Sequence, residues 1–363
     1  MTRFERSIRD LRPWKVVVGS TTLIAGAKAK GPAMRIGLLT GGGDCPGLNA
    51  AIRAVVRVAT ASGDEIVGFH RGWRGVVEGD SAMLTTAETK GILQSGGTIL
   101  RTARYHPDEH EGGTAAVLST LEQDRIDALI VIGGDGTLAS ANQLARTGVP
   151  IVGIPKTIDN DVSGTRRCIG FDTAVATAAE AIDRVHTTGE SHDRLMVVEV
   201  MGRTTGWLAV SAGIAAGADA ICLPEEITDL DALAKAIHER HNAGSTSSVV
   251  VVAEGARFLG AIERPSDSMG ALVSAELASR TGYETRLTVL GHVQRGGAPT
   301  AADRLLATTF GVAAVDAVHA HSYNSMVCVQ NEQTELTSLD TVAQGPRPVP
   351  DALLEIARRL TVN

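Results

Sequence analysis

The stretch LIVIGGDGTLASA, residues 129–141, carries the local pattern that decides the fold. An apolar run ends in a pair of glycines, and a stretch with helical character follows, which is the order strand, turn, helix. Glycine has no Cβ atom, so the backbone can turn sharply there and bring its N–H groups close to a ligand. The N-terminus of the following helix would stabilise negative charge at the same place.

The same order recurs along the chain, first at LLTGGGDCPGLNAAIR near the start of the folded part. The apolar runs are continuous rather than alternating, which is typical of strands buried on both faces of a parallel sheet. Strands are expected at residues 35–40, 65–69, 127–132, 150–154, 195–200, 220–224, 248–253 and 286–291. Helices are expected at residues 48–61, 138–147, 172–188, 205–215, 229–242 and 301–319.

Right-handed βαβ crossovers between these elements predict an α/β fold. We expect two Rossmann-like α/β lobes with mainly parallel sheets and the active site in the cleft between them, because one group of strands ends near residue 170 and the next begins near residue 195. The expected units are an extension (1–33), a first lobe (34–170) completed by part of 293–345, a second lobe (171–292) and a C-terminal helix (346–363).

Composition and charge narrow the functional classes. The chain has 363 residues, a length that suits about two domains. Its net charge of −7 and the absence of a basic tract disfavour a nucleic-acid partner, and no apolar run reaches the ~20 residues of a membrane span. The cysteines are scattered without a CxxC pair, which predicts reduced thiols in a cytoplasmic protein.

Residues 1–33 stand apart, because a well-formed strand pattern opens only at Met34. A basic flank, an apolar stretch and small residues give this segment a loose likeness to a secretory signal. Polar residues interrupt the apolar stretch at 19–22. We therefore favour an N-terminal extension for which disorder is the expectation, or a start codon placed too early.

Two expected strands are each followed by a segment that contains carboxylates, together with glycines in GGDGT (133–137) and with a lysine in PKTIDND (155–161). In GGDGT, Asp135 would lie beside a phosphate cradle, where a carboxylate is tolerated if a cation such as Mg²⁺ lies between the two; the alternative is an ordinary helix cap. In PKTIDND, Asp159 and Asp161 would point the same way in extended backbone. One could accept a proton while Lys156 neutralises phosphate charge, and the alternative is a loop whose side chains bond to their own backbone.

A set of arginines flanks further strand ends, and arginine binds phosphate in a bidentate manner. Its members are Arg104, Arg194, Arg203, Arg286 and Arg295. Taken singly, each is better explained as a solvated surface residue. Glu254 could accept hydrogen bonds from sugar hydroxyls or pair with a structural arginine. These patterns predict a two-lobed enzyme that handles phosphates with Mg²⁺, without specifying the substrate.

The segments GGGDCPGLNAAIR, GGDGT, PKTIDND, MGR and GHVQRGG, in that order, resemble the 6-phosphofructokinase family over about residues 34–320. GGDGT alone is a weak signal, since lipid kinases and NAD kinases carry similar loops, but the ordered set is specific. The resemblance implies transfer of the γ-phosphoryl group of MgATP to the 1-hydroxyl of fructose 6-phosphate, giving fructose 1,6-bisphosphate and ADP in glycolysis.

The resemblance also implies a role for each matching residue. Catalysis would involve Lys156, Thr157, Asp159 and Arg203, with Asp159 as the base. The first lobe would hold the phosphoryl donor through Gly43, Arg104, Tyr105, Gly134, Asp135, Gly136 and Thr137, with Asp135 on Mg²⁺. The sugar phosphate would contact Thr157, Ile158, Asp159, Arg194, Met201, Gly202, Arg203, Glu254, Arg286, His292, Val293, Gln294 and Arg295. Arg194 would reach a neighbouring active site in a homodimer or homotetramer.

The identity of the phosphoryl donor depends on two positions. Lysine at 156 is frequent in pyrophosphate-using members of the family, whereas glycine at 136 leaves room for the α-phosphate of ATP. The pair resembles the mixed-substrate branch, and the steric argument favours ATP. The alternatives are a pyrophosphate-dependent phosphotransferase and a non-catalytic sugar-phosphate-binding paralogue. Another acceptor, such as sedoheptulose 7-phosphate, also stays open.

Overall fold

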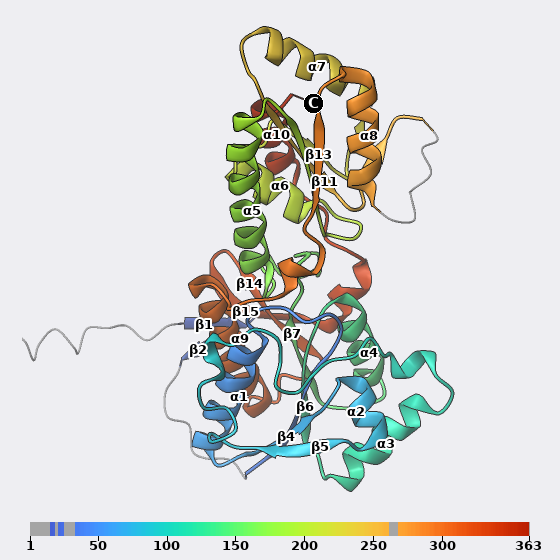
Figure 1. Ribbon diagram of the computed structural model, residues 1–363. Helices are drawn as coiled ribbons and strands as arrows, with labels where there is room; N and C mark the ends of the chain where they lie inside the picture. Colours follow the sequence, from blue (N-terminus) through green and yellow to red (C-terminus); the bar gives the residue numbers. More distant parts are fainter. Residues whose placement is uncertain (1–14, 19–20, 25–32, 261–267, 363) are drawn as a thin grey trace, which may run out of the picture.

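The computed structural model describes residues 15–18, 21–24, 33–260 and 268–362, and these residues form two α/β lobes, one above the other in Figure 1. The expected fold class is confirmed. Each lobe is built around its own sheet. The long helix α5 (Phe171–Ser191) leads the chain from the first lobe into the second.

Among the described residues, the larger sheet holds nine strands, and its central strands are parallel. In spatial order they are β2 (Thr21–Ile24), β1 (Lys15–Val18), β15 (Gln333–Ser338), β14 (Ser325–Gln330), β7 (Ile151–Pro155), β6 (Ala128–Gly133), β3 (Arg35–Thr40), β4 (Glu65–Phe69) and β5 (Ser81–Leu84). Antiparallel pairs occur only towards the edges: β4 with β5, β14 with β15 and β1 with β2.

The second lobe contains a parallel sheet of four strands, ordered β13 (Thr285–Val289), β8 (Leu195–Val200), β11 (Ser248–Ala253) and β9 (Ala220–Cys222). A short parallel pair, β10 (Ile227–Thr228) and β12 (Arg257–Phe258), lies apart from it. All pairings within the four-stranded sheet are parallel, so the carboxyl ends of its strands point to one edge. Ligands of open α/β sheets bind beyond such an edge.

Helices cover both sheets (Figure 1). Those of the first lobe are α1 (Leu48–Ser62), α2 (Trp73–Glu78), α3 (Gly113–Gln123), α4 (Asp135–Ala145) and α9 (Ala301–His319). Those of the second lobe are α5, α6 (Trp207–Ala215), α7 (Leu230–Asn242), α8 (Met269–Thr281) and α10 (Asp351–Leu360). The chain therefore returns to the first lobe for α9, β14 and β15 and ends on the second.

Continuous apolar strands give the larger sheet two buried faces. Along β6, Ile130 and Ile132 pack into the core beneath α1 and α9, while Leu129 and Val131 pack into the core beneath α2, α3 and α4. The period-2 alternation of side chains directs successive residues to opposite faces, and both faces are covered. All six residues of β6 are buried, as the sequence pattern predicted.

Several expected elements differ from those observed. β13 has an exposed edge rather than two buried faces, and its Val289 is 48% exposed. Helix α4 begins at Asp135, three residues earlier than expected, because Gly136 and Thr137 belong to its first turn. The sequence analysis missed α2, α3, α8, β5, β14 and β15.

The N-terminal extension is described only in part. Residues 15–18 and 21–24 form an antiparallel pair of strands, and Val17 is paired with Glu335 of β15. These eight residues are strands, and the expectation of disorder for the extension as a whole stays a prediction. For residues 1–14, 19–20 and 25–32 this prediction lies outside the described part of the chain.

Candidate active site

A pocket of about 130 Å³ lies at the carboxyl ends of β3, β6 and β7, where loops of the second lobe approach them. This volume is below the ~300–1,000 Å³ of sites that enclose a whole organic ligand, so it suits the reacting groups rather than complete substrates. The pocket is lined by Gly42, Gly43, Arg104, His106, Gly134, Asp135, Gly136, Thr137, Lys156, Thr157, Asp159, Arg203 and Arg295. The sequence analysis proposed all of these residues except Gly42 and His106.

The two glycine turns lie beside each other because β3 and β6 are parallel neighbours. Thr137 links them: its buried side chain fills the space that a Cβ atom at Gly41 or Gly133 would need, at 2.6 and 2.4 Å. Gly42 has φ 81°, a left-handed conformation that glycine adopts without strain. A side chain at Gly41 or Gly133 would therefore displace Thr137 and alter the cradle.

Lys156 holds the first glycine turn from below. Its side chain is 2% exposed, and its Nζ donates hydrogen bonds to the carbonyl oxygens of Gly41 at 2.9 Å and Gly43 at 2.5 Å. Burial lowers its pKa, and the neighbouring charge of Arg295 lowers it further. An ammonium group has three donors, so one remains for a ligand in the pocket.

The segment Thr157–Asp161 is a turn rather than the extended backbone that the sequence analysis assumed, since Asn160 has φ 52°. The hydroxyl of Thr157 accepts a hydrogen bond from the backbone N–H of Asp159 at 3.1 Å. Asn160 fixes the loop from within, because its Oδ1 accepts from the backbone N–H of Cys168 at 2.9 Å. The two aspartates remain close enough to influence each other's ionisation.

Asp159 is an unusual carboxylate. It is 3% exposed, and among the described residues its Oδ1 has no hydrogen-bond partner. Burial raises its pKa to about 6, and the neighbouring Asp161 adds to the effect, whereas Arg295 and Arg203 oppose it. A carboxylate with this pKa is ionised at neutral pH and is a stronger base than an ordinary aspartate.

Arg203 brings the second lobe to the pocket. Its Nη1 lies 3.3 Å from Oδ1 of Asp135 in the first lobe, so the ion pair spans the two lobes. Arg203 has φ 54°, and its backbone N–H donates to Oε1 of Glu254 at 2.6 Å. Glu254 lies outside the pocket lining and anchors the turn that presents Arg203.

Arg295 approaches from the loop after β13. Its Nη1 lies 2.6 Å from the position that a Cβ atom on Gly43 would occupy and donates to the carbonyl oxygen of Asp44 at 3.3 Å. The neighbouring Gln294 is fully buried, and its Oε1 accepts from the backbone N–H of Met201 at 3.0 Å. The segment 294–295 therefore ties the MGR turn to the first glycine turn.

Other residues proposed from the sequence lie outside the pocket lining. Arg194 and Arg286 both pair with Glu284, Arg194 at 2.9 Å, which brings these two arginines together. Ile158 is fully buried in the hydrophobic core, which leaves only its backbone available to a ligand. Tyr105 stacks on His110 with ring centroids 4.4 Å apart. Met201, Gly202, Glu254, His292, Val293 and Gln294 are likewise absent from the lining.

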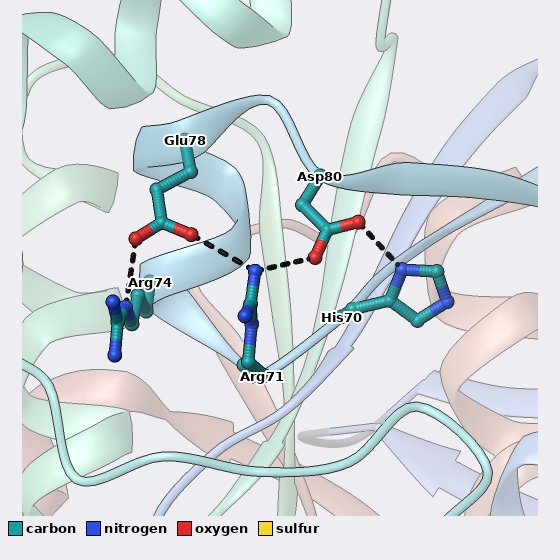
Figure 2. Close-up of polar contacts among 5 residues, drawn as sticks. All are labelled: His70, Arg71, Arg74, Glu78 and Asp80. Atoms are coloured by element: carbon teal, nitrogen blue, oxygen red, sulfur yellow. Dashed lines mark hydrogen bonds and ion pairs between the residues drawn. The ribbon is translucent and has the colours of Figure 1, made fainter.

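A polar cluster that no sequence motif predicts joins the ends of β4 and α2 to the start of β5. In Figure 2, Arg71 lies between Glu78 and Asp80, with nitrogen–oxygen distances of 2.9 and 2.7 Å. Arg74 pairs with Glu78 and His70 with Asp80, so the ends of β4 and α2 and the start of β5 are joined. Helix α2 begins at Trp73, whose buried indole N–H donates to the carbonyl oxygen of Thr137 at 3.1 Å.

Arg347, far away in the sequence, holds the loop that carries Asp159. Its Nη2 donates to the carbonyl oxygens of Asn160 at 2.7 Å and Arg166 at 3.1 Å. Its guanidinium carbon lies 4.1 Å from the ring centroid of Trp207, a cation–π distance. The indole N–H of Trp207 donates to the carbonyl oxygen of Arg347 at 3.0 Å. Arg347 therefore joins the Asp159 loop to the first residue of α6.

The remaining chemistry-bearing residues show no second centre in the described part of the chain. The four cysteines are free and buried there. No cluster of three His, Cys, Asp or Glu side chains suitable for a metal ion occurs among the described residues. In the same residues, no helix is both long and apolar enough to cross a membrane.

The first lobe contributes two glycine turns, both lobes contribute cations, and between them lies a buried carboxylate whose Oδ1 has no partner among the described residues. This arrangement fits one class of protein, a two-lobed phosphotransferase. The chain belongs to the phosphofructokinase family, whose model matches residues 35–318.

Curated relatives agree with this assignment. "ATP-dependent 6-phosphofructokinase 3" of Streptomyces coelicolor is 47% identical over 88% of this chain and 97% of its own length. The ATP-dependent 6-phosphofructokinase of Mycobacterium tuberculosis is 46% identical over 88% of this chain and 97% of its own length. A relative from Amycolatopsis mediterranei is named as a pyrophosphate–fructose 6-phosphate 1-phosphotransferase. It is also 46% identical, over 87% of this chain and 96% of its own length.

Solved structures support the fold. The phosphofructokinase of Pichia pastoris superposes with a TM-score of 0.80 at 33% identity, over 94% of this chain and 38% of the longer yeast chain. The chain thus spans well under half of that protein. A pyrophosphate-dependent phosphofructokinase of Nitrosospira multiformis also gives a TM-score of 0.80, over 87% of this chain and 86% of its own, but at 19% identity it supports the fold alone.

Proposed function

We propose that the protein is an ATP-dependent 6-phosphofructokinase that transfers the γ-phosphoryl group of MgATP to the 1-hydroxyl of fructose 6-phosphate. The observation that carries this proposal is Asp159, a buried carboxylate whose Oδ1 has no partner in the described part of the chain and which lies in a pocket lined by Lys156, Arg203 and Arg295. The names of the relatives from Streptomyces and Mycobacterium support the donor and the acceptor.

In the proposed reaction, Asp159 accepts the proton of the sugar 1-hydroxyl while the oxygen of that hydroxyl forms a bond to the γ-phosphorus. The bond from that phosphorus to the β–γ bridging oxygen breaks, and its electron pair leaves on ADP. Lys156 and Arg203 neutralise charge on the transferring group, an effect that is strong in a site from which water is excluded. The turn at Gly134, where α4 begins, would direct the free backbone N–H groups of the first helical turn to the donor phosphates.

The residues present fit a magnesium ion. Burial raises the pKa of Asp161, and the nearby charge of Asp135 raises it further, so the two carboxylates repel each other. Mg²⁺ binds one or two carboxylates together with substrate phosphate oxygens. Asp135 would hold the ion, which would neutralise phosphate charge, and the 3.3 Å pair with Arg203 would then give way to that contact.

The sugar 6-phosphate is proposed to bind Arg286, His292 and Arg295, with Arg194 acting on a neighbouring subunit. Arg194 and Arg286 each pair with Glu284, so both side chains are available to an anionic group at this face. They lie outside the pocket that holds Asp159, which supports a site completed by a second chain in a homodimer or homotetramer. In this arrangement residues 34–170 and 171–292 serve the donor and the sugar phosphate respectively.

Pyrophosphate is the alternative donor, favoured by Lys156 and by the name of the Amycolatopsis relative. Lys156 donates hydrogen bonds to the carbonyl oxygens of Gly41 and Gly43. These bonds support a role in holding the glycine turn, whether ATP or pyrophosphate is the phosphoryl donor. Gly136 lines the pocket without a side chain, which favours ATP. A cytoplasmic location is proposed from the glycolytic reaction.

The proposed reaction is tested by following ³¹P NMR spectra of the purified protein with MgATP and fructose 6-phosphate. We expect the bisphosphate signals of fructose 1,6-bisphosphate and those of ADP to grow together. A parallel sample with sedoheptulose 7-phosphate tests the acceptor. Hydrolysis of ATP without a sugar bisphosphate would overturn the proposal.

A further inference from the structure

His106 forms a wall of the pocket that no family motif covers. It lies directly before the short helix η2 (Pro107–Glu109), and its ring faces Gly136. A Cβ atom at position 136 would lie 2.7 Å from Cε1 and 3.2 Å from Nε2 of this ring. Any side chain at position 136 must therefore displace His106.

A short hydrogen-bond chain fixes which ring nitrogen carries the proton. Ser140, on the second turn of α4, donates its hydroxyl hydrogen to Oδ1 of Asp108 at 2.5 Å. Since Ser140 has only one hydrogen to give, its contact with Nδ1 of His106 at 3.2 Å requires Nδ1–H to be the donor. In the neutral ring, Nε2 is then a hydrogen-bond acceptor, and no hydrogen bond uses it within the described residues.

An acceptor at this position distinguishes between classes of donor. The ribose hydroxyls and the base amino groups of a nucleotide can donate hydrogen bonds, whereas ionised phosphate oxygens can only accept them. We propose that His106 is a specificity residue of the donor site: its Nε2 accepts a hydrogen bond from the nucleoside part of the nucleotide, and Ser140 and Asp108 are positioning residues that hold it in the accepting tautomer. This inference rests on the proposed ATP-dependent function.

The contact with Gly136 adds a second consequence. Glycine at 136 is needed to seat the His106 ring as well as to leave space for a phosphate. The two requirements are separable. Removing the His106 ring removes the need to seat it, whereas the need for phosphate space at position 136 remains.

Binding of MgATP and of magnesium tripolyphosphate, measured by calorimetry at pH 8, tests the first part. Tripolyphosphate carries the same phosphate chain without a nucleoside. We expect His106→Ala to weaken ATP binding about 3–10-fold, the loss of one hydrogen bond, and to leave tripolyphosphate binding unchanged. Ser140→Ala should weaken ATP binding in the same direction by less. His238→Ala is the matched control, since His238 is also half-buried and bonded to a hydroxyl, that of Tyr283, on the second lobe.

Equal losses for ATP and tripolyphosphate, or no loss for either, would overturn the assignment of His106. If the wild-type protein phosphorylates fructose 6-phosphate with ATP, such a result leaves the proposed function intact. A wild-type protein that binds tripolyphosphate but neither binds nor uses ATP would remove the proposed function, and the role of His106 with it.

A double-mutant cycle of Gly136→Ala and His106→Ala tests the second part. Gly136→Ala should weaken ATP binding markedly in the wild-type background and less in the His106→Ala background, so the two changes are not additive. Additive losses would show that the methyl group at 136 acts on the ligand alone and would refute the coupling.

Discussion

Replacing Asp159 by asparagine should remove activity and raise stability at once. The substitution preserves the shape of the side chain but removes its negative charge and its ability to take a proton. General base catalysis contributes about 10²–10⁴-fold to rates, so kcat should fall by that factor. KM for fructose 6-phosphate should change little, because the hydroxyl can still bond to the amide oxygen.

The stability gain follows from the pKa of Asp159. The folded value of about 6 lies above the ordinary 3.8, a difference of about 2.2 pH units, which corresponds to about 3 kcal/mol at 1.36 kcal/mol per unit. Below about pH 3.8 both folded and unfolded forms hold the proton, and the carboxyl has no effect. As the pH rises towards 6, the unfolded form ionises first and wild-type stability falls, and above about 6 the full penalty is present.

Urea unfolding of both proteins at pH 4.5 and pH 8, with kcat measured on the same preparations, checks this prediction. The variant should exceed the wild type by up to about 3 kcal/mol at pH 8 and by much less at pH 4.5. Asp340→Asn is the control of opposite sign: hydrogen bonds from Arg146 and Asn142 lower the pKa of this exposed carboxyl, so its loss should not stabilise the protein or change kcat. Retained kcat, or a stability gain that does not depend on pH, would refute the role of Asp159.

Three further perturbations have defined outcomes. Gly136→Asp should abolish turnover with ATP and can reveal turnover with pyrophosphate, because the new carboxylate crowds His106 and repels a nucleotide phosphate; full ATP activity in this variant would sink the steric account. Arg347→Met should lower the free energy of unfolding by about 2–4 kcal/mol, because hydrogen bonds to two carbonyl oxygens are lost, and it should affect kcat more than KM. Arg347→Lys should recover part of the stability and part of the kcat. Urea titrations and initial rates check both variants. A chain that begins at Met34 should keep the kcat of the full chain, because the pocket lining includes no residue before Gly42, and a large loss would contradict this placement.

The strands and turns of the site could be predicted because their signals are local. Continuous apolar runs such as 128–133 indicate a buried parallel strand wherever they occur, and a glycine turn after such a run marks the ligand-binding edge. β14 was missed, although its first five residues are buried, because no glycine turn follows it and the chain returns directly into the antiparallel strand β15. β13 was misjudged because an exposed edge strand and a central strand can carry the same residues.

The missed site residues act through contacts that are distant in sequence. Trp73, Arg347 and His106 belong to no motif, and each is identified only by a contact in the folded chain. Trp73 donates to the carbonyl oxygen of Thr137, and Arg347 donates to that of Asn160. The His106 ring occupies the space that a side chain at Gly136 would need. The positive φ of Asn160 likewise depends on Cys168 and Arg347, which hold the turn from outside it. Sequence patterns therefore predicted most of the residues that line the pocket, and tertiary contacts determine how those residues are held.

Initial rates of the purified protein would decide whether it transfers phosphate from ATP to fructose 6-phosphate, with fructose 6-phosphate and Mg²⁺ supplied in parallel with ATP or with pyrophosphate. We expect turnover with ATP and none of comparable rate with pyrophosphate. Turnover with pyrophosphate alone would contradict this expectation, because Lys156 would then outweigh the space left by Gly136.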